Sequence, residues 1–169
     1  FYDQAFTKPV KYVFDNKVNT SADLTLYAGY DVDYSGIYTY ERNASGDEMT
    51  ILTFNSFAYF MGTMEIPETI ELLPVTAIAD DFFPNSDFGM GVFFDTLDFG
   101  EHSKVREIGV NAFTGASFEV INLPENLERI GAGAFIGNLV KQISFPETLE
   151  YIDAEAFEAC GELADITFA

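Results

Sequence analysis

Three short patterns hold residue types that carry chemistry. The first is a glycine-rich run, Gly131-Ala132-Gly133-Ala134-Phe135-Ile136-Gly137, with the spacing of loops that hold dinucleotide phosphates. That chemistry needs a strand before the loop, a helix after it and a complete βαβ unit. The same positions read Gly109-Val110-Asn111 one stride of 22 residues earlier and Asp153-Ala154-Glu155 one stride later. We therefore interpret the glycines as part of a repeated turn, and we expect no cofactor.

The second pattern, Asp31-Val32-Asp33-Tyr34-Ser35-Gly36, resembles the first half of a calcium-binding loop. Side-chain oxygens stand at positions 1, 3 and 5, and a glycine stands at position 6. Position 12, which should be a bidentate glutamate, is Arg42. We expect a turn that joins two modules rather than a metal site, with a weak cation site as the alternative.

The third pattern is the pair of unique residues, His102 and Cys160. Catalysis by a cysteine needs a base within hydrogen-bonding reach of the thiol. The repeat described below places the two residues about two coils apart, roughly 10 Å at strand spacing, and points Cys160 inward as a filler. Acids are abundant, but no pair is singled out for glycoside hydrolysis. The sequence therefore predicts that the protein is not an enzyme.

A repeat of 22 residues sets the elements that position these side chains. Residues 126–135 recur as residues 148–157, and residues 105–113 fit one stride earlier. The positions that keep the stride are Ile108, Ile130 and Ile152, then Ala112, Ala134 and Ala156, then Phe113, Phe135 and Phe157. A period of about 20–29 residues with fixed apolar positions indicates a stacked leucine-rich solenoid.

Each coil is expected to contain two short strands. The first strands are alternating segments at residues 119–124, 141–146 and 164–168, and earlier at 63–67 and 96–99. The second is a Leu-x-x-Ile segment, followed by a turn with the Ala-Phe pair that we expect to be helical or 3₁₀. In the earlier coil, residues 75–79 form the second strand and Phe83 is the large ring. Insertions are expected at residues 70–74 and 84–92.

The predicted fold is thus a β-rich α/β solenoid, a right-handed leucine-rich repeat horseshoe with short helical or 3₁₀ turns. Residues 36–62 are expected to form a β-hairpin that caps the first coil, with Asn43-Ala44-Ser45-Gly46 as its turn. The coils then occupy residues 63–169, and residues 1–35 form a separate segment.

The run Leu-Pro-x-x-Leu-x-x-Ile-x-x-x-Ala-Phe resembles the BspA-like leucine-rich repeats of bacterial surface proteins over roughly residues 36–169. The usual cysteine position of that family holds Ala116, Asn138 and Cys160, so only the last coil keeps it. Residues 1–30 are similar to the closing half of a Listeria–Bacteroides repeat, a small β-grasp-like unit. The segments that carry this second resemblance are residues 1–3, 6–9, 15–18 and 23–28, with Tyr30 in place of the usual tryptophan.

Charge excludes several classes of partner. The 169 residues carry 28 acids against 8 lysines and arginines, a net charge of −20, and no lysine or arginine lies between Asn43 and Ser103. Such a surface offers no cations to a phosphate backbone or an anionic lipid headgroup, so we expect no nucleic-acid partner. No apolar run approaches the ~20 residues of a membrane span, so we expect no membrane insertion.

The remaining candidate site is the outward face of the first strands, which would be the concave face of the horseshoe. One expected row is Glu65, Asp98, Asn122, Ser144 and Thr167, and the parallel row is Thr63, Thr96, Val120, Gln142 and Asp165. Solenoids bind along such faces. Small polar side chains without aromatic or arginine anchors fit a shallow protein-recognition surface and an inert solvated sheet about equally.

Two functions follow as hypotheses. The family resemblance implies a cell-surface or secreted protein-binding module, with adhesion to a host matrix or cell-surface protein or contact between bacteria. The alternative is a structural spacer that displays another domain. Because Ala169 directly follows a first strand, we also expect an open last coil and end-to-end association of two copies through it.

Overall fold

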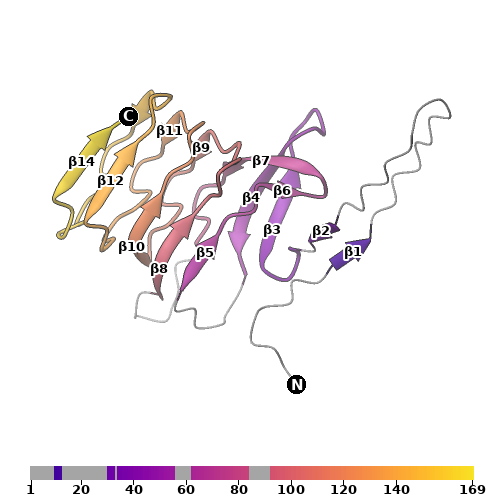
Figure 1. Cartoon of the computed structure of the whole chain (residues 1–169), viewed down its shortest axis with the longest axis horizontal. Coiled ribbons are helices and arrows are strands. Elements are labelled where there is room, and N and C mark those ends of the chain that lie inside the picture. Colours follow the sequence, from indigo (N-terminus) through magenta and orange to yellow (C-terminus); the bar gives the residue numbers. More distant parts are fainter. Residues whose placement is uncertain (1–9, 13–29, 33, 56–61, 84–91) are drawn as a thin grey trace, which may run out of the picture.

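The structure is a computed structural model that describes residues 10–12, 30–32, 34–55, 62–83 and 92–169. Its described part is a stack of short coils, each of which contributes strands to two sheets (Figure 1). The strands are β1 (Val10–Tyr12), β2 (Tyr30–Val32), β3 (Tyr38–Arg42), β4 (Met49–Phe54), β5 (Thr63–Glu65), β6 (Thr69–Ile70), β7 (Leu73–Ile78), β8 (Val92–Asp98), β9 (Glu107–Ile108), β10 (Ala116–Asn122), β11 (Arg129–Ile130), β12 (Gln142–Phe145), β13 (Tyr151–Ile152) and β14 (Asp165–Phe168).

The second strands of the coils form one continuous sheet, which we call the second sheet. Its order is β13-β11-β9-β7-β4-β3, and β6 pairs with the protruding end of β7. All pairs from β4 to β13 are parallel, and the pair of β3 with β4 is antiparallel. The segment that we expected to form a hairpin cap therefore extends this sheet at its N-terminal end.

The first strands form two separate groups, which together we call the first sheet. β5, β8 and β10 pair in parallel, and β12 pairs in parallel with β14. These strands lie side by side along the long axis of the molecule, from β5 to β14 (Figure 1). No hydrogen-bonded ladder joins β10 to β12 in the described structure, so the first sheet is interrupted between these two coils.

Asn138 lies at the interruption, fully buried. Its side-chain oxygen accepts a hydrogen bond from the Phe118 amide at 2.9 Å, and its side-chain nitrogen donates to the carbonyl oxygens of Ala116 and Phe135 at 3.3 and 3.2 Å. The side chain thus satisfies backbone groups at the start of β10 that a neighbouring strand would otherwise pair. A buried amide that makes these bonds does not suffer the cost of an unpaired polar group.

A column of aromatic rings fills the space between the sheets. Phe113 stacks on Phe135 and Phe135 stacks on Phe157, each with ring centroids 5.2 Å apart and nearly parallel planes. The column continues upstream through Phe82, edge-on to Phe113 at 5.3 Å. Phe83, which we expected to be this ring, packs on Phe54 and Phe94 instead. The strands enclose the column because their alternate residues point inward.

The Ala-Phe segments are tight turns, and the described residues contain no helix. The helical or 3₁₀ turns that we expected are therefore not seen there. Four turns have a left-handed residue at equivalent positions, Asp81, Asn111, Gly133 and Glu155, with φ between 50° and 65°, and three of these turns end at a second one, Gly115, Gly137 or Ala159. A left-handed residue interrupts the dihedral angles that a helix would need, so the amides bond to the next coil instead, as Phe113 does to Ala134.

Gly109 and Gly131 mark where coils approach most closely. A Cβ atom on Gly131 would lie 2.6 Å from the backbone carbon of Gly109, and one on Gly109 would lie 2.5 Å from the backbone of Ala79. These distances are shorter than any real contact, so a side chain at either position would push neighbouring coils apart. Packing between coils therefore explains Gly131 of the glycine-rich run, whereas Gly133 and Gly137 have positive φ values of 65° and 72°.

Candidate functional site

The structure places the two rows of candidate residues in register within each group of the first sheet. Glu65 pairs with Asp98 and Asp98 with Asn122, while Thr63 pairs with Thr96 and Thr96 with Val120. In the second group Gln142 pairs with Asp165, and Ser144 pairs with Thr167. Asp98 and Thr96 are partly exposed and the other eight are exposed. The interruption between β10 and β12 divides each row into three residues and two residues.

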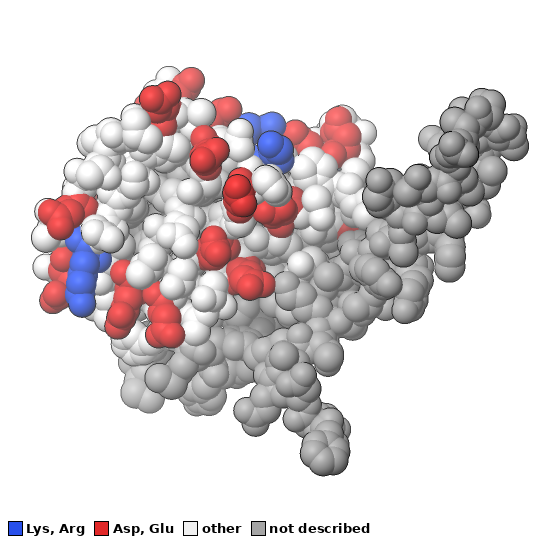
Figure 2. Space-filling view, in the orientation of Figure 1, with Lys and Arg blue, Asp and Glu red and all other residues white. Residues whose placement is uncertain are grey.

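The outer face of the first sheet is acidic toward its N-terminal end. Its described strands hold five acids, Glu65, Asp95, Asp98, Glu119 and Asp165, and no lysine or arginine. The acids Glu65 and Asp98 lie on adjacent strands in one row, whereas Asn122, Ser144 and Thr167 continue that row without charge. The face of the molecule in Figure 2 shows many acidic groups and few basic ones.

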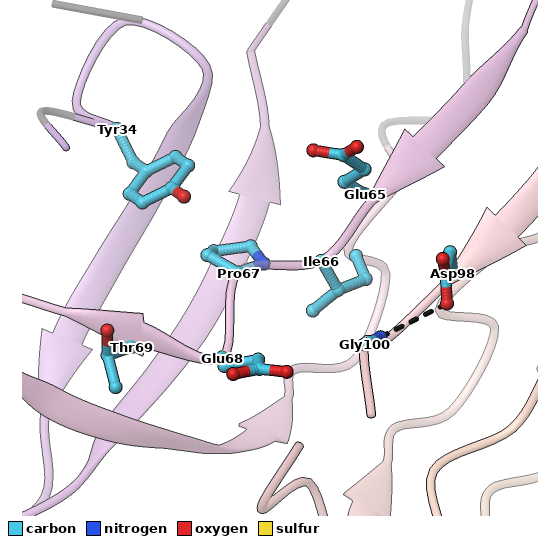
Figure 3. A pocket seen from close by; sticks show the side chains of 8 residues that line it. All are labelled: Tyr34, Glu65, Ile66, Pro67, Glu68, Thr69, Asp98 and Gly100. Atoms are coloured by element: carbon cyan, nitrogen blue, oxygen red, sulfur yellow. Dashed lines mark hydrogen bonds between the residues drawn. The ribbon is translucent and has the colours of Figure 1, made fainter. Parts of the chain in front are cut away.

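A cavity of about 330 Å³ opens at the C-terminal ends of β5 and β8. Its floor is made by Ile66 and Pro67, both buried, and one wall is the ring of Tyr34, from the segment before β3. In Figure 3 the carboxylate of Glu65 extends toward the Tyr34 side, and Asp98 lies on the opposite side. Glu68, Thr69 and Gly100 complete the lining.

Hydrogen bonds fix the rim of this cavity. One carboxylate oxygen of Glu68 accepts from the His102 amide at 2.8 Å, and Asp98 accepts from the Gly100 amide at 3.1 Å. The buried Tyr38 hydroxyl donates to the Glu65 carbonyl oxygen at 2.6 Å, and burial raises the pKa of this phenol, so it stays a donor. The carboxylates therefore come from three segments whose backbones are tied to the core or to each other.

Sequence reasoning missed this cavity, although it proposed Glu65 and Asp98 for the outward row. The signal that could have pointed to it is the coil length: from Met64 to Ile78 the chain uses 14 residues, where Ile121 to Ile130 uses 9. The extra residues form the β6–β7 hairpin, whose start supplies Glu68 and Thr69 to the cavity. Tyr34 lies far from Asp98 in sequence, so no local pattern joins them.

The outer face of the second sheet differs because it carries arginines, each of them in an ion pair. Arg106 donates to both carboxylate oxygens of Glu48, at 2.9 and 3.0 Å, and Arg42 pairs with Glu71 at 2.6 Å. Arg129 pairs with Asp153 at 2.5 Å, which raises the pKa of the guanidinium. The three arginines of the chain are thus engaged across strands or hairpins of this sheet.

The chemical patterns singled out in the sequence do not form reaction centres in the described structure. Arg42, at position 12 of the half-loop that begins at Asp31, belongs to β3 and pairs with Glu71; residue 33 lies outside the described residues. The Cys160 thiol is half-buried, donates to the Phe135 carbonyl oxygen, and has its pKa raised by desolvation. A raised pKa keeps the thiol protonated, so it is not an activated nucleophile.

No group of three or more His, Cys, Asp and Glu side chains in the described part of the chain is placed to hold a metal ion. Nor does any helix there have the length and apolar character needed to cross a membrane.

Two sheets of short parallel strands around a column of phenylalanines, with one tight turn per coil, define a β-solenoid of the leucine-rich repeat class. Residues 93–169 match the family model described as "BspA type Leucine rich repeat region (6 copies)". This part of the chain is therefore a BspA-type leucine-rich repeat region, as the sequence indicated. A search of curated proteins found no match.

Solved structures agree with the fold. The chain is similar to a leucine-rich repeat protein of T. pallidum, with 22% identity, a TM-score of 0.54, and coverage of 78% of this chain and 69% of that one. It is also similar to a leucine-rich repeat protein from Bacteroides capillosus, with 24% identity, a TM-score of 0.56, and coverage of 79% and 95%. At this identity the likeness concerns the fold alone.

Proposed function

We propose that the chain is a non-enzymatic protein-binding module of a bacterial cell-surface or secreted protein, and that its first sheet is the contact surface. The observation that carries the proposal is the difference between the two outer faces. The rows of the first sheet are in register and open to solvent, whereas the arginines of the second sheet are engaged in ion pairs. Repeat proteins use extended faces of this kind to bind partners.

The chemistry of the surface indicates the type of contact. Within the two rows, Thr63, Thr96, Gln142 and Ser144 offer hydroxyl and amide groups, and no residue of these rows has an aromatic ring. Interfaces without aromatic or arginine anchors lack strong hot spots, so affinity depends on contact along several coils. We propose a host matrix protein, a host cell-surface protein or another bacterial surface protein as the partner in such an adhesive contact, and these partners would be met outside the cell.

Substitutions that add bulk to one face test the proposal. Biolayer interferometry against a panel of purified matrix and epithelial surface proteins first identifies a partner that binds the unmodified chain. We expect Thr96→Arg with Gln142→Arg to abolish binding to that partner. The matched control is Glu128→Arg with Glu150→Arg, since both residues are exposed and directly precede β11 and β13 of the second sheet. Equal loss in the two variants, or no loss in either, would exclude the first sheet as the contact surface.

The second candidate is a structural spacer. The continuous second sheet and the aromatic column favour it, because together they make a rigid stack that could hold another domain at a distance. A spacer has no ligand of its own, so the unmodified chain would bind no member of the panel. Binding by the unmodified chain that the first-sheet variant loses would exclude this candidate.

Self-association is a further element of the proposal. In the 169-residue chain the last coil exposes Ile152, Ile166 and Phe168, the last of them 74% exposed. Apolar groups on an edge strand favour contact with a second strand. We expect the chain to form dimers in sedimentation equilibrium and Phe168→Ser to weaken them. A chain that is monomeric at all concentrations would exclude this contact.

A further inference from the structure

The cavity beside Tyr34 combines three features that suit one kind of side chain. The buried Ile66 and Pro67 give it an apolar floor, and the ring of Tyr34 gives it an aromatic wall (Figure 3). Carboxylates of Glu65 and Asp98 stand at opposite sides of its mouth. Its volume of about 330 Å³ lies near the lower end of the range for ligand sites, roughly 300–1,000 Å³, which favours a single side chain over a whole ligand.

A second cavity on the same edge of the first sheet provides an internal comparison. It has about 320 Å³ and lies at the ends of β10 and β12, where Asn122, Leu123, Ser144 and Pro146 line it. Among the described residues that line it, Glu125 is the one acidic side chain, and none is aromatic. The two cavities occupy equivalent places in the repeat, so the aromatic wall and the added acids of the first are features of its own coil.

Those features come from departures from the repeat. The β6–β7 hairpin insertion brings Glu68 and Thr69 to the cavity, and the segment before β3 brings Tyr34. Insertions in repeat proteins commonly lie on the binding face. The three arginines of the chain pair with carboxylates at the second sheet, and none of them lines this cavity.

We propose that this cavity receives a lysine or arginine side chain of a protein partner, and that the module selects its partners by a basic residue at this position. The aliphatic stem of such a side chain packs on Ile66 and Pro67, because long basic side chains bury their stems and keep their charge in water. The charged end lies between Glu65 and Asp98 and over the face of Tyr34, a geometry that attracts a cation. The inference rests on the proposed role of the first sheet in protein binding.

An NMR titration of the ¹⁵N-labelled 169-residue chain tests the cavity directly. The probe is N-acetyl-arginine methylamide, and its neutral counterpart is the citrulline derivative, which has the same shape without the charge. We expect the arginine probe to shift the amides of residues 65–69 and 98–100 in a saturable way, and the citrulline probe to bind at least about tenfold more weakly. Glu65→Gln with Asp98→Asn should weaken the arginine probe by about tenfold.

The matched control is Glu125→Gln with Glu147→Gln, two exposed acids of later coils, because it removes the same charge elsewhere. We expect this variant to bind the arginine probe like the unmodified chain. Equal binding of citrulline and arginine, equal weakening in both double variants, or shifts spread over acids throughout the chain would overturn the proposal. Asp98→Asn keeps a side-chain oxygen that can accept from the Gly100 amide. The NMR spectrum of each variant reports whether it is folded.

The result separates this inference from the proposed function. If a partner protein binds through the first sheet but Glu65→Gln with Asp98→Asn leaves its affinity unchanged, the cavity is not used and only the present inference fails. If the arginine probe binds in the cavity but Thr96→Arg with Gln142→Arg leaves protein binding intact, the contact surface proposed above is wrong.

Discussion

The two sheets of the solenoid differ in how their strands are joined and in what their outer faces carry. The second sheet runs unbroken from β3 to β13, although three of its strands have only two residues. The first sheet has longer strands but is interrupted between β10 and β12. Arginine–carboxylate pairs cross the second sheet, whereas the strands of the first sheet carry acids and no basic residue.

This difference indicates a division of roles within each coil. Backbone bonds of the second sheet and of the Ala-Phe turns hold neighbouring coils together, and the aromatic column fills the space that they enclose. The outward residues of the first sheet are then free of packing constraints, since their side chains point to solvent. Substitutions on either side of the molecule can test this division.

Loss of a ring from the aromatic column should have the largest effect. Phe135 is fully buried and stacks on rings of both neighbouring coils, so Phe135→Ala removes contacts in two directions. We expect a loss of about 3–5 kcal/mol in the free energy of unfolding, measured in urea. Phe93, which is 60% exposed on β8 of the first sheet, is the control, and Phe93→Ala should change stability by no more than about 0.5 kcal/mol. Similar losses in both variants would contradict the division of roles.

Loss of the Asn138 side chain should have the next largest effect, because this side chain bonds to backbone groups where the first sheet is interrupted. Asn138→Ala leaves the Phe118 amide and the Ala116 carbonyl without their partner in the interior, and we expect a loss of about 2–4 kcal/mol in urea unfolding. The equivalent residue one coil later is Cys160, whose thiol makes one bond to Phe135. Cys160→Ala should cost less than about 1 kcal/mol, and an equal cost at both positions would mean that the amide does not bridge the coils.

Neutralising one acid at each sheet should change the free energy of unfolding in opposite directions. Glu48 is partly buried and accepts from Arg106, Thr76 and Asn43, so Glu48→Gln should cost about 0.5–1 kcal/mol. Most of that cost should disappear in 1 M salt, where the Debye length falls to about 3 Å. Glu119→Gln on β10 should be neutral or slightly stabilising, because it reduces repulsion in a chain of net charge −20. Thermal unfolding at two salt concentrations measures both variants.

Much of this architecture could be predicted from the sequence, because equivalent residues make the same contacts in successive coils. The positions of Phe113, Phe135 and Phe157 gave the column, and the alternation in residues 141–146 and 164–168 gave β12 and β14 with their outward rows. Such positions are set by local period, which a single sequence reveals. The expected helical turns were not found, because left-handed residues such as Glu155 are hard to infer from residue type.

The features that the sequence did not predict lie where the chain departs from the repeat. Asn138 occupies the position that usually holds cysteine in BspA-like repeats. Only the structure shows that the side-chain amide of Asn138 bonds to the previous coil. The cavity beside Tyr34 depends on an insertion and on a segment from before β3, so it joins residues of separate coils. Long-range contacts of this kind leave no periodic signal in the chain.

The smallest effect should come from the tip of the β3–β4 hairpin, which extends the second sheet away from the aromatic column. Hydrogen bonds from Ser45 and then Asn43 lower the pKa of the Asp47 carboxyl below its ordinary value. A carboxyl with a lowered pKa in the folded state stabilises the fold above its unfolded pKa, about 3.9, and this contribution is lost as the pH falls through the folded value. Below pH 4, the amides of residues 43–48 should therefore exchange faster, while those of residues 129–135 should stay protected.

Ser45→Ala should raise the pKa of Asp47 in an NMR titration of side-chain carboxyls; if it does not, the hydroxyl does not hold this carboxylate. Faster exchange at residues 129–135 in the same pH range would show that the hairpin and the coils open together, and the second sheet would then be one cooperative unit.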